Sequence, residues 1–306
     1  MLEDKKLIAR FCKDFSLPIK IYDREYFNYF ATLYNDYFEV DKNMKLLKEA
    51  LSEFEDSTEF LKYYNELQDL IIDTIKEKEE YIEFSNADFS KFKVDSKYCV
   101  DNIYKNTNLG KCFVSIDLNK ANFQALHFYN ENIVEKAESY EEFISKFTKF
   151  KYFTKSKHFR QVVFGNLNPK RQLKIEQFLI EQIIEFLSSK NILCKDDIVM
   201  ATKDEVIFEI DENNVPNIKF ILDSIKSNLN IDAKVEAFKL NGICGYYVKE
   251  DLNSKKYTFS CVPSIYYPQV FKIYHNLEIN EKDLTFFYEG NLARFMNPIN
   301  NVTSIV

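Results

Sequence analysis

The sequence predicts an α+β protein, with a small antiparallel sheet that has helices on one face, a helical region before it and a mixed appendage after it. Two observations lead to this fold class. The first 84 residues have apolar residues at three-to-four spacing, whereas short apolar runs typical of buried strands begin at Cys112. Within residues 111–250 the elements follow the order strand, helix, helix, hairpin, helix and strand. Residues 251–306 combine aromatic residues with several prolines.

The helical region starts with aromatic residues at helical spacing over Asp23–Phe38. Asp56-Ser-Thr-Glu59 has the pattern of a capping box and opens a long helix. One face of that helix is an apolar stripe, formed by Phe60, Tyr64, Leu67, Ile71 and Ile75. Such a stripe is a packing face, so we expect it to contact the core or a protein partner. The polar residues 85–111 mark the end of this region.

Acidic residues are expected at two strand ends within residues 111–250. Cys112-Phe-Val-Ser-Ile is typical of a short buried strand that ends at Asp117, and helical spacing follows over Asn119–Val134. Asp197–Ile210 has the pattern of a hairpin with Thr202-Lys-Asp-Glu205 at its tip. The other predicted elements are helices over Pro169–Ser189 and Pro216–Leu229 and a strand over Ala233–Leu240 that meets an Asn241-Gly242 turn.

Composition indicates a globular protein. With 306 residues, of which 46% are hydrophobic, the chain can build a core. No apolar run reaches the ~18 residues of a membrane-spanning helix, and the start lacks the order of a signal peptide. We therefore expect a cytoplasmic protein without a membrane partner. The six cysteines form no C-x-x-C pair and only three histidines are present, which favours free thiols over structural zinc.

The five glycines exclude several common nucleotide and hydrolase motifs. A phosphate-cradling loop needs closely spaced glycines, and the chain contains neither G-x-x-x-x-G-K nor G-x-G-x-x-G. A G-x-S-x-G elbow is also missing. The chain is therefore not expected to be an ordinary P-loop ATPase, Rossmann dehydrogenase or serine hydrolase.

Positive charge is concentrated in one stretch of an acidic protein. The formal net charge is −7, which argues against indiscriminate binding of nucleic acid. Between residues 149 and 174 the chain has no Asp or Glu. Its cations there are Lys149, Lys151, Lys155, Lys157, Arg160, Lys170, Arg171 and Lys174. A local anion-binding surface is therefore possible despite the negative total.

Three motifs resemble those of nucleic-acid polymerases. Phe113-Val-Ser-Ile-Asp117 with its following helix resembles motif A, and Lys203-Asp-Glu-Val-Ile-Phe-Glu-Ile210 resembles the motif C hairpin of family A DNA polymerases. Arg160-Gln-Val-Val-Phe164-Gly165 is similar to the fingers-helix signature, motif B. The order is that of the family. The resemblance implies a palm with a short fingers insertion over residues 111–250 and a thumb-like or partner-binding region over residues 1–110.

The resemblance implies that Asp117 and Asp204 bind Mg²⁺ or Mn²⁺, with Glu205 as a third or supporting carboxylate. Nucleotidyl transfer uses two divalent ions, and carboxylates are the ligands that Mg²⁺ prefers. Two carboxylates about 4 Å apart would repel each other by about 4 kcal/mol at an effective dielectric near 20. A cation bound between two such carboxylates would offset their repulsion.

Nucleoside triphosphates and nucleic acid are the partners that the resemblance implies. Its substrate contacts would be Lys155, Lys157 and Arg160 on the triphosphate, Phe164 stacked on the base, and Asn122 and Phe123 around the nucleotide. The contacts to nucleic acid would be Lys149, Lys151, Lys170, Arg171 and Lys174.

The chain departs from the family A pattern at several positions. Asn122 stands where motif A usually has Glu, Lys203 replaces the usual His, and Ser156 stands where the first fingers cation would lie. The segment between Phe164 and Asp204 is much shorter than family A fingers and closer to a minimal palm such as a reverse transcriptase. Phe123 also resembles the reverse-transcriptase aromatic that excludes or admits a ribose hydroxyl, so sugar preference stays open.

Each residue also has an ordinary structural interpretation. Asp117 could be the N-cap of the next helix, and Asp204 and Glu205 could be turn acids. The cations could form a solvated face, and Phe123 and Phe164 could be core residues.

Three functions follow from these alternatives. The first is a small primer-extending DNA or RNA polymerase without a proofreading domain. The second is an inactive palm that serves as a nucleic-acid-binding or scaffolding subunit of a larger complex. The third is a template-independent nucleotidyltransferase. Frequent Lys, Asn, Ile, Phe and Tyr suggest an AT-rich genome, such as that of a phage or a low-GC bacterium.

Overall fold

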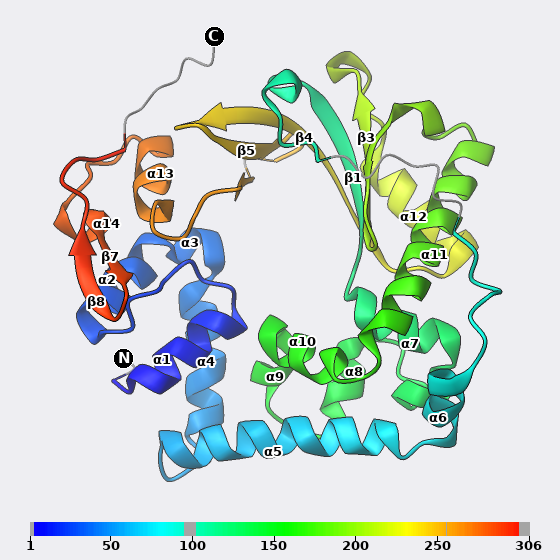
Figure 1. Ribbon diagram of the computed structural model, residues 1–306, viewed down its shortest axis with the longest axis horizontal. Coiled ribbons are helices and arrows are strands. Elements are labelled where there is room, and N and C mark those ends of the chain that lie inside the picture. The colour runs from blue at the N-terminus through cyan, green and yellow to red at the C-terminus, as the bar shows by residue number, and fades with distance from the viewer. Residues whose placement is uncertain (1–2, 95–101, 255, 300–306) are drawn as a thin grey trace. The chain divides into compact units, whose positions relative to one another are not determined.

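The computed structural model describes residues 3–94, 102–254 and 256–299 (Figure 1). The chain divides into two compact units, each assembled from separate segments. Unit 1 comprises Met1–Lys78, Ala137–Leu167 and Val262–Asn301, and the described part of unit 2 comprises segments of Glu79–Lys136 and Asn168–Cys261. These limits differ from the predicted boundaries at residues 110 and 250. The stretch predicted as a fingers insertion belongs with the N-terminal helices instead of the sheet.

Unit 1 is mostly helical. Its elements are α1 (Lys5–Asp14), α2 (Arg24–Leu33), α3 (Asn35–Phe38), α4 (Val40–Leu51), α5 (Ser57–Lys76), α8 (Tyr140–Ser145), α9 (Lys151–Lys155), α10 (Lys157–Gly165), α13 (Tyr267–Tyr274), α14 (Glu281–Leu284), β7 (Thr285–Tyr288) and β8 (Asn291–Arg294). The carboxylate of Asp56 caps α5 by accepting from the amides of Thr58 and Glu59. The whole predicted stripe of α5 is buried, which confirms that it is a packing face.

A buried carboxylate joins three helices of unit 1. Asp14 is fully buried at the end of α1. It accepts hydrogen bonds from the hydroxyl of Tyr64 on α5, at 2.7 Å, and from the hydroxyl of Tyr152 on α9. A buried carboxylate is tolerated only where donors replace its water, so both tyrosines stabilise the fold at this point.

Unit 2 contains the sheet. Its elements are α6 (Glu79–Asn86), η1 (Asn106–Asn108), β1 (Cys112–Leu118), α7 (Ala121–Tyr129), η2 (Glu131–Val134), α11 (Pro169–Ser189), η3 (Lys195–Asp197), β2 (Ile198–Ala201), β3 (Glu205–Ile210), η4 (Glu212–Asn214), α12 (Ile218–Leu229), β4 (Ala233–Ile243), β5 (Tyr246–Asp251) and β6 (Tyr257–Ser260). The six strands form one antiparallel sheet in the order β2-β3-β1-β4-β5-β6.

The central strands follow the split β-α-β order. The chain runs from β1 through α7 and α11 to the β2–β3 hairpin, then through α12 to β4, and β1 lies between β3 and β4 (Figure 1). This is the β-α-β-β-α-β arrangement in which the first and third strands are central. Strands β5 and β6 extend the sheet beyond β4. The predicted antiparallel sheet is therefore confirmed and is larger than expected.

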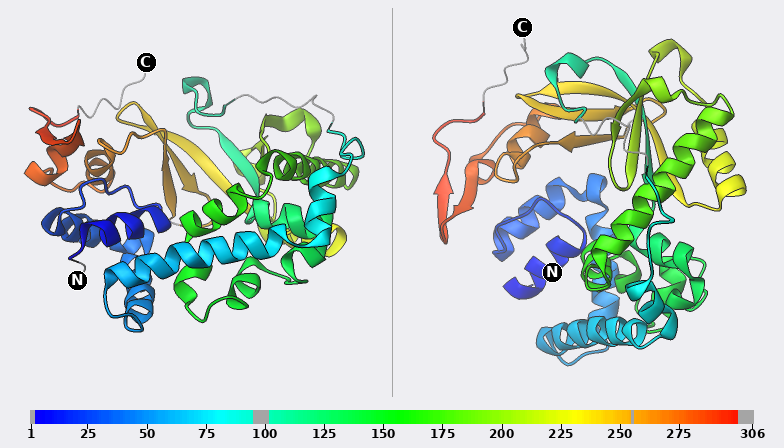
Figure 2. Two further views of the ribbon diagram at one scale, coloured as in Figure 1. Left: turned by 60° about the horizontal axis from the view of Figure 1, so that its bottom comes forward. Right: turned by 45° about the vertical axis from the view of Figure 1, so that its right-hand side comes forward.

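The two faces of the sheet differ because side chains alternate along each strand. Helix α11 contacts β3 and α12 contacts β4, and the two helices also contact each other (Figure 2). The opposite face contains an apolar cluster, whose buried members are Ile103, Phe113, Met200, Ile207, Phe238 and Leu240. This second face holds Asp117, Glu205 and Lys249, which are described below.

Most predicted elements of unit 2 are correct. The helix over Pro169–Ser189 matches α11 residue for residue, and the hairpin tip is a two-residue turn, Lys203-Asp204. The turn predicted at Asn241-Gly242 is wrong because β4 continues to Ile243. The chain reverses instead at Cys244-Gly245, where both residues have positive φ, 50° and 77°. Such φ values suit a tight hairpin turn.

Candidate active site

Two carboxylates share one end of the central strands. Asp117 on β1 is the direct antiparallel partner of Glu205 on β3. The turn residue Asp204 lies beside them, because the backbone amide of Leu118 donates to its carbonyl oxygen at 2.8 Å. The end of β1 and the tip of the hairpin therefore meet, as the sequence predicted.

Asp117 is not a helix cap. The following helix α7 begins at Ala121, its N-cap residue is Lys120, and no side chain caps it. The Asp117 carboxylate is instead half-buried at the end of the strand, with Lys234 of β4 as its partner on the other side. The alternative interpretation of Asp117 as an N-cap is therefore wrong.

Glu205 belongs to a polar network on the apolar face of the sheet. The hydroxyl of Ser115 donates to Glu205 Oε1 at 2.6 Å, and Lys249 Nζ lies 3.7 Å from the same oxygen. The Lys249 ammonium also lies 4.7 Å from the ring centroid of Phe238 and 5.7 Å from that of Tyr104. This lysine is only 16% exposed, so Glu205 has a cationic partner from within the protein.

The electrostatics of Asp117 reflect its acidic neighbours. The pKa of Asp117 is raised from an ordinary value of 3.8 to about 6. Burial is the largest cause, the nearby Glu205 and Asp204 carboxylates contribute, and the charge of Lys234 opposes the rise. The ionised form of Asp117 is thus disfavoured. A cation placed between these carboxylates would relieve that repulsion.

A fourth carboxylate, that of Glu176, lies near the hairpin tip on α11. Glu176 is 1% exposed, accepts a hydrogen bond from Asn122 Nδ2 at 3.1 Å, and lies 4.0 Å from Lys203 Nζ. The pKa of Glu176 is raised to about 7, chiefly by burial; the charge of Lys203 opposes the rise and that of Asp204 contributes to it. Asn122, predicted to shape a nucleotide pocket, therefore has its amide bound to Glu176.

The two predicted aromatic contacts are core residues. Phe164 has no exposed surface and packs near Tyr140 and Phe143 in unit 1. Phe123 is 4% exposed and packs near His127. Neither ring presents a free face, so the expectation that Phe164 stacks on a base and Phe123 shapes the nucleotide pocket is corrected. The alternative that both belong to the core holds.

The predicted triphosphate-binding cations lie in unit 1, whereas Asp117 and Asp204 lie in unit 2. Lys155 pairs with Glu141 at 3.6 Å, and the Arg160 guanidinium lies 5.7 Å from the ring centroid of Tyr140. Lys157 is exposed at the start of α10. The split arises because the chain passes from one unit to the other after Leu167.

The predicted nucleic-acid contacts are also divided between the units. Lys149 pairs with Glu53 at 2.7 Å in unit 1, where Lys151 is exposed. In unit 2, Lys170 is exposed and Lys174 half-buried at the start of α11. The neighbouring Arg171 donates to the Ala87 carbonyl at 2.8 Å and covers the Phe89 ring, so it holds the segment after α6.

The donors near Asp117 suit a hard divalent cation only in part. Asp117 at the end of β1 and Asp204 in the adjoining hairpin turn offer carboxylate oxygens, and such oxygens are the ligand type of Mg²⁺ and Mn²⁺. Within residues 3–94, 102–254 and 256–299, however, no three Asp, Glu, His or Cys side chains are arranged to hold a metal ion. A metal here would need ligands from its substrate or from water, as Mg²⁺ commonly has.

Sequence reasoning missed Ser115, Glu176 and Lys249. Ser115 could have been found from the period-2 pattern, since it lies on the same face as Asp117. Glu176 lies within an apolar helical face, which is an unusual place for a carboxylate. Nothing in the sequence linked Lys249 to Glu205, because strand order decides which residues meet.

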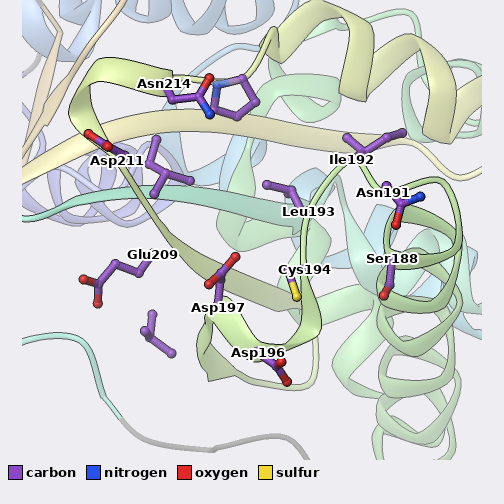
Figure 3. Close-up of a pocket in the computed structure, with 13 residues that line it drawn as sticks. Ser188, Asn191, Ile192, Leu193, Cys194, Asp196, Asp197, Glu209, Asp211 and Asn214 are labelled. Carbon is purple, nitrogen blue, oxygen red and sulfur yellow. The ribbon is translucent and has the colours of Figure 1, made fainter.

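A hollow in unit 2 lies at the other end of the sheet strand β3. It has a volume of about 760 Å³ and is lined by acids near the far end of β3, among them Asp196, Asp197, Glu209 and Asp211 (Figure 3). Glu209 there pairs with Lys111 at 2.9 Å. An acidic lining repels phosphates, so this hollow does not suit a nucleotide.

Comparisons add no family assignment: no protein-family model, no curated protein and no solved structure matches the chain. Among the described residues, no helix has the length and apolar character needed to cross a membrane. The five cysteines that the structure describes, Cys12, Cys112, Cys194, Cys244 and Cys261, are free thiols, as expected, and Cys99 lies outside the described residues.

Proposed function

We propose that the protein is a metal-dependent nucleotidyltransferase of the polymerase type, which extends a primer with nucleoside triphosphates. The observation that carries the proposal is the meeting of Asp117 with Glu205 and the Asp204 turn at one end of a split β-α-β sheet. The polymerase palm is a sheet of this kind with its metal-binding acids at strand ends, as the motif resemblance implies.

In this proposal Asp117 and Asp204 hold a divalent cation, Mg²⁺ or Mn²⁺. The bound ion would supply activation of the primer hydroxyl and neutralisation of the triphosphate. The raised pKa of Asp117 supports a cation site, because a bound cation would favour the ionised carboxylate that the neighbouring acids disfavour. Glu205 would support Asp117 from the next strand.

Exposed cations would bind the polyanionic partners. Lys157 and Lys151 in unit 1 and Lys170 in unit 2 have solvent-exposed ammonium groups and suit phosphate contacts. We also propose that Arg160 and Lys155 bind the triphosphate of the incoming nucleotide. Arg171 is assigned a structural role through its bond to Ala87.

One observation favours the second candidate, an inactive palm in a nucleic-acid-binding or scaffolding subunit. Lys249 already pairs with Glu205, and an internal cation can replace a metal in balancing a carboxylate. The third candidate, untemplated nucleotide addition, would use the same two aspartates.

Primer extension separates these candidates. The wild-type protein, D117N, D204N and the control E209Q are incubated with a primed template, nucleoside triphosphates and Mg²⁺ or Mn²⁺. Glu209 is a matched control because it lies on the same strand and face as Glu205 but at the other end. The proposal predicts templated products from wild type and E209Q and none from D117N or D204N. Untemplated tails indicate the third candidate. Products of wild-type amount from both aspartate variants would refute the site.

A further inference from the structure

The buried Glu176 contacts both chain segments that flank the proposed metal-binding carboxylates. Its Oε1 accepts from Asn122, which lies on α7 just after the Asp117 strand end. Its Oε2 lies 4.0 Å from the ammonium of Lys203, the residue next to Asp204 in the turn. One side chain on α11 therefore reaches the first turn of α7, which follows β1, and the tip of the β2–β3 hairpin.

Glu176 lies in surroundings where an ionised carboxylate is destabilised unless a cation or hydrogen-bond donors contact it. The residue is 1% exposed, and its Oε2 has no hydrogen-bond donor among the residues that the structure describes. Neighbouring residues on α11, such as Ile175, Leu179 and Ile180, are buried hydrophobics. A carboxylate in such surroundings needs a cation or donors to offset its desolvation, and Lys203 is the nearby cation.

Lys203 connects Glu176 to the hairpin tip that carries Asp204. Lys203 and Asp204 form a two-residue turn. Within the residues that the structure describes, the Asp204 carboxylate accepts one hydrogen bond, from Thr202 Oγ1 at 3.4 Å. That contact is weak by its length. Lys203, one residue earlier, is 47% exposed on its side chain yet reaches Glu176 in the interior.

We propose that Glu176 is a positioning residue of the metal site: through Lys203 and Asn122 it fixes the separation between Asp204 and Asp117. This inference rests on the proposed function, because it concerns the same two aspartates. Glu176 touches neither metal nor substrate in this account. It acts as the supporting partners of metal ligands do, whose loss typically lowers metal affinity about 10- to 100-fold.

Mn²⁺ titration followed by electron paramagnetic resonance tests the inference on the full chain without using activity. The informative variant is K203M, since removing a cation near a metal site should tighten Mn²⁺ binding if charge alone matters. Loss of positioning predicts the opposite. We expect K203M and E176Q each to weaken Mn²⁺ binding about tenfold or more, and K203R to bind Mn²⁺ like wild type. The double variant E176Q/K203M should bind Mn²⁺ no more weakly than the single variant with the lower affinity, because both substitutions break the same link.

Two controls separate failure of this inference from failure of the proposed function. E181Q removes another largely buried carboxylate of α11 and should leave Mn²⁺ binding unchanged. D117N should abolish it. If D117N binds Mn²⁺ as wild type does, the proposed metal site itself is refuted, and the positioning role with it. If D117N abolishes binding while K203M binds as tightly as wild type or more tightly, Glu176 is not a positioning residue. Should E176Q fail to fold, K203M decides, because Lys203 is partly exposed at a turn.

Discussion

Asp117 and Glu205 face each other across the β1–β3 ladder, and Lys249 reaches Glu205 from β5, two strands beyond β1. The end of the sheet thus combines two adjacent carboxylates with one internal cation. Burial of Asp117, together with its acidic neighbours Glu205 and Asp204, raises its pKa, and the arrangement defines which substitutions should reveal a cation site.

The D117N variant should change how stability depends on pH. The pKa of Asp117 in the folded protein is about 6, above its ordinary 3.8, so between these values the folded state binds more protons than the unfolded state. The free energy of unfolding of wild type therefore falls as pH rises through this window. D117N has no carboxyl group to titrate here, so its free energy of unfolding does not fall in this window. Near pH 7.5 it should be more stable than wild type by about 1–2 kcal/mol, a figure reduced for the partial exposure of Asp117.

Urea denaturation at about pH 4 and about pH 7.5 measures this difference. The stabilisation of D117N over wild type should be larger at the higher pH. An equal difference at both pH values would mean that Asp117 titrates normally.

Lys249 should compete with divalent cations. In K249M, Glu205 loses its internal partner while the bond from Ser115 remains, so repulsion between Glu205 and Asp117 increases. A ligand that binds only the folded state raises its stability, and a more negative site should bind Mn²⁺ more tightly. We expect the rise in Tm on adding Mn²⁺ to be larger for K249M than for wild type. A smaller rise than in wild type would show that Lys249 supports the site instead of competing for it.

Phe164 should matter for folding and not for base stacking. It is fully buried in unit 1, so F164A should lower the free energy of unfolding by about 3–5 kcal/mol. The control F220A removes a ring that is 56% exposed on α12 and should change stability by about 0.5 kcal/mol or less. Equal stabilities of F164A and F220A in chemical denaturation would contradict the core assignment.

Tyr64 should stabilise unit 1 through the buried Asp14 carboxylate. Y64F removes the 2.7 Å hydrogen bond to Asp14 and leaves Tyr152 as its remaining tyrosine donor. Because hydrogen bonds to charged groups contribute more than neutral ones, we expect a loss of about 1.5–3 kcal/mol in the free energy of unfolding. Y288F, at a tyrosine that is 61% exposed, is the matched control and should be neutral. Wild-type stability of Y64F would indicate that Asp14 does not depend on this donor.

Local sequence patterns predicted much of unit 2. Apolar periodicity and the proline at its first position predicted α11 correctly, and the alternation around Lys203-Asp204 predicted the hairpin. Because β1 and the hairpin strand β3 pair directly, the predicted meeting of Asp117 with the tip acids was also correct. These features depend on residues close together in sequence and on one strand pairing.

Local sequence patterns did not predict which residues far apart in the chain pack together. The cations over residues 149–160 were grouped with the sheet because they lie between its motifs in sequence, yet they belong to unit 1. Phe164 looked like a stacking residue because of its neighbours Arg160 and Gly165, although burial decides its role. Glu176 and Lys249 reach the site only through helix packing and strand order, which no local motif encodes.

A crystal structure of the protein with Mn²⁺ and a non-hydrolysable nucleoside triphosphate would show whether Asp117 and Asp204 bind a metal ion together. We expect anomalous density for Mn²⁺ within ligand distance of both the Asp117 and Asp204 carboxylates, with triphosphate oxygens completing the coordination. Mn²⁺ bound elsewhere, with Asp117 and Asp204 contacting only protein side chains, would contradict the proposed metal site.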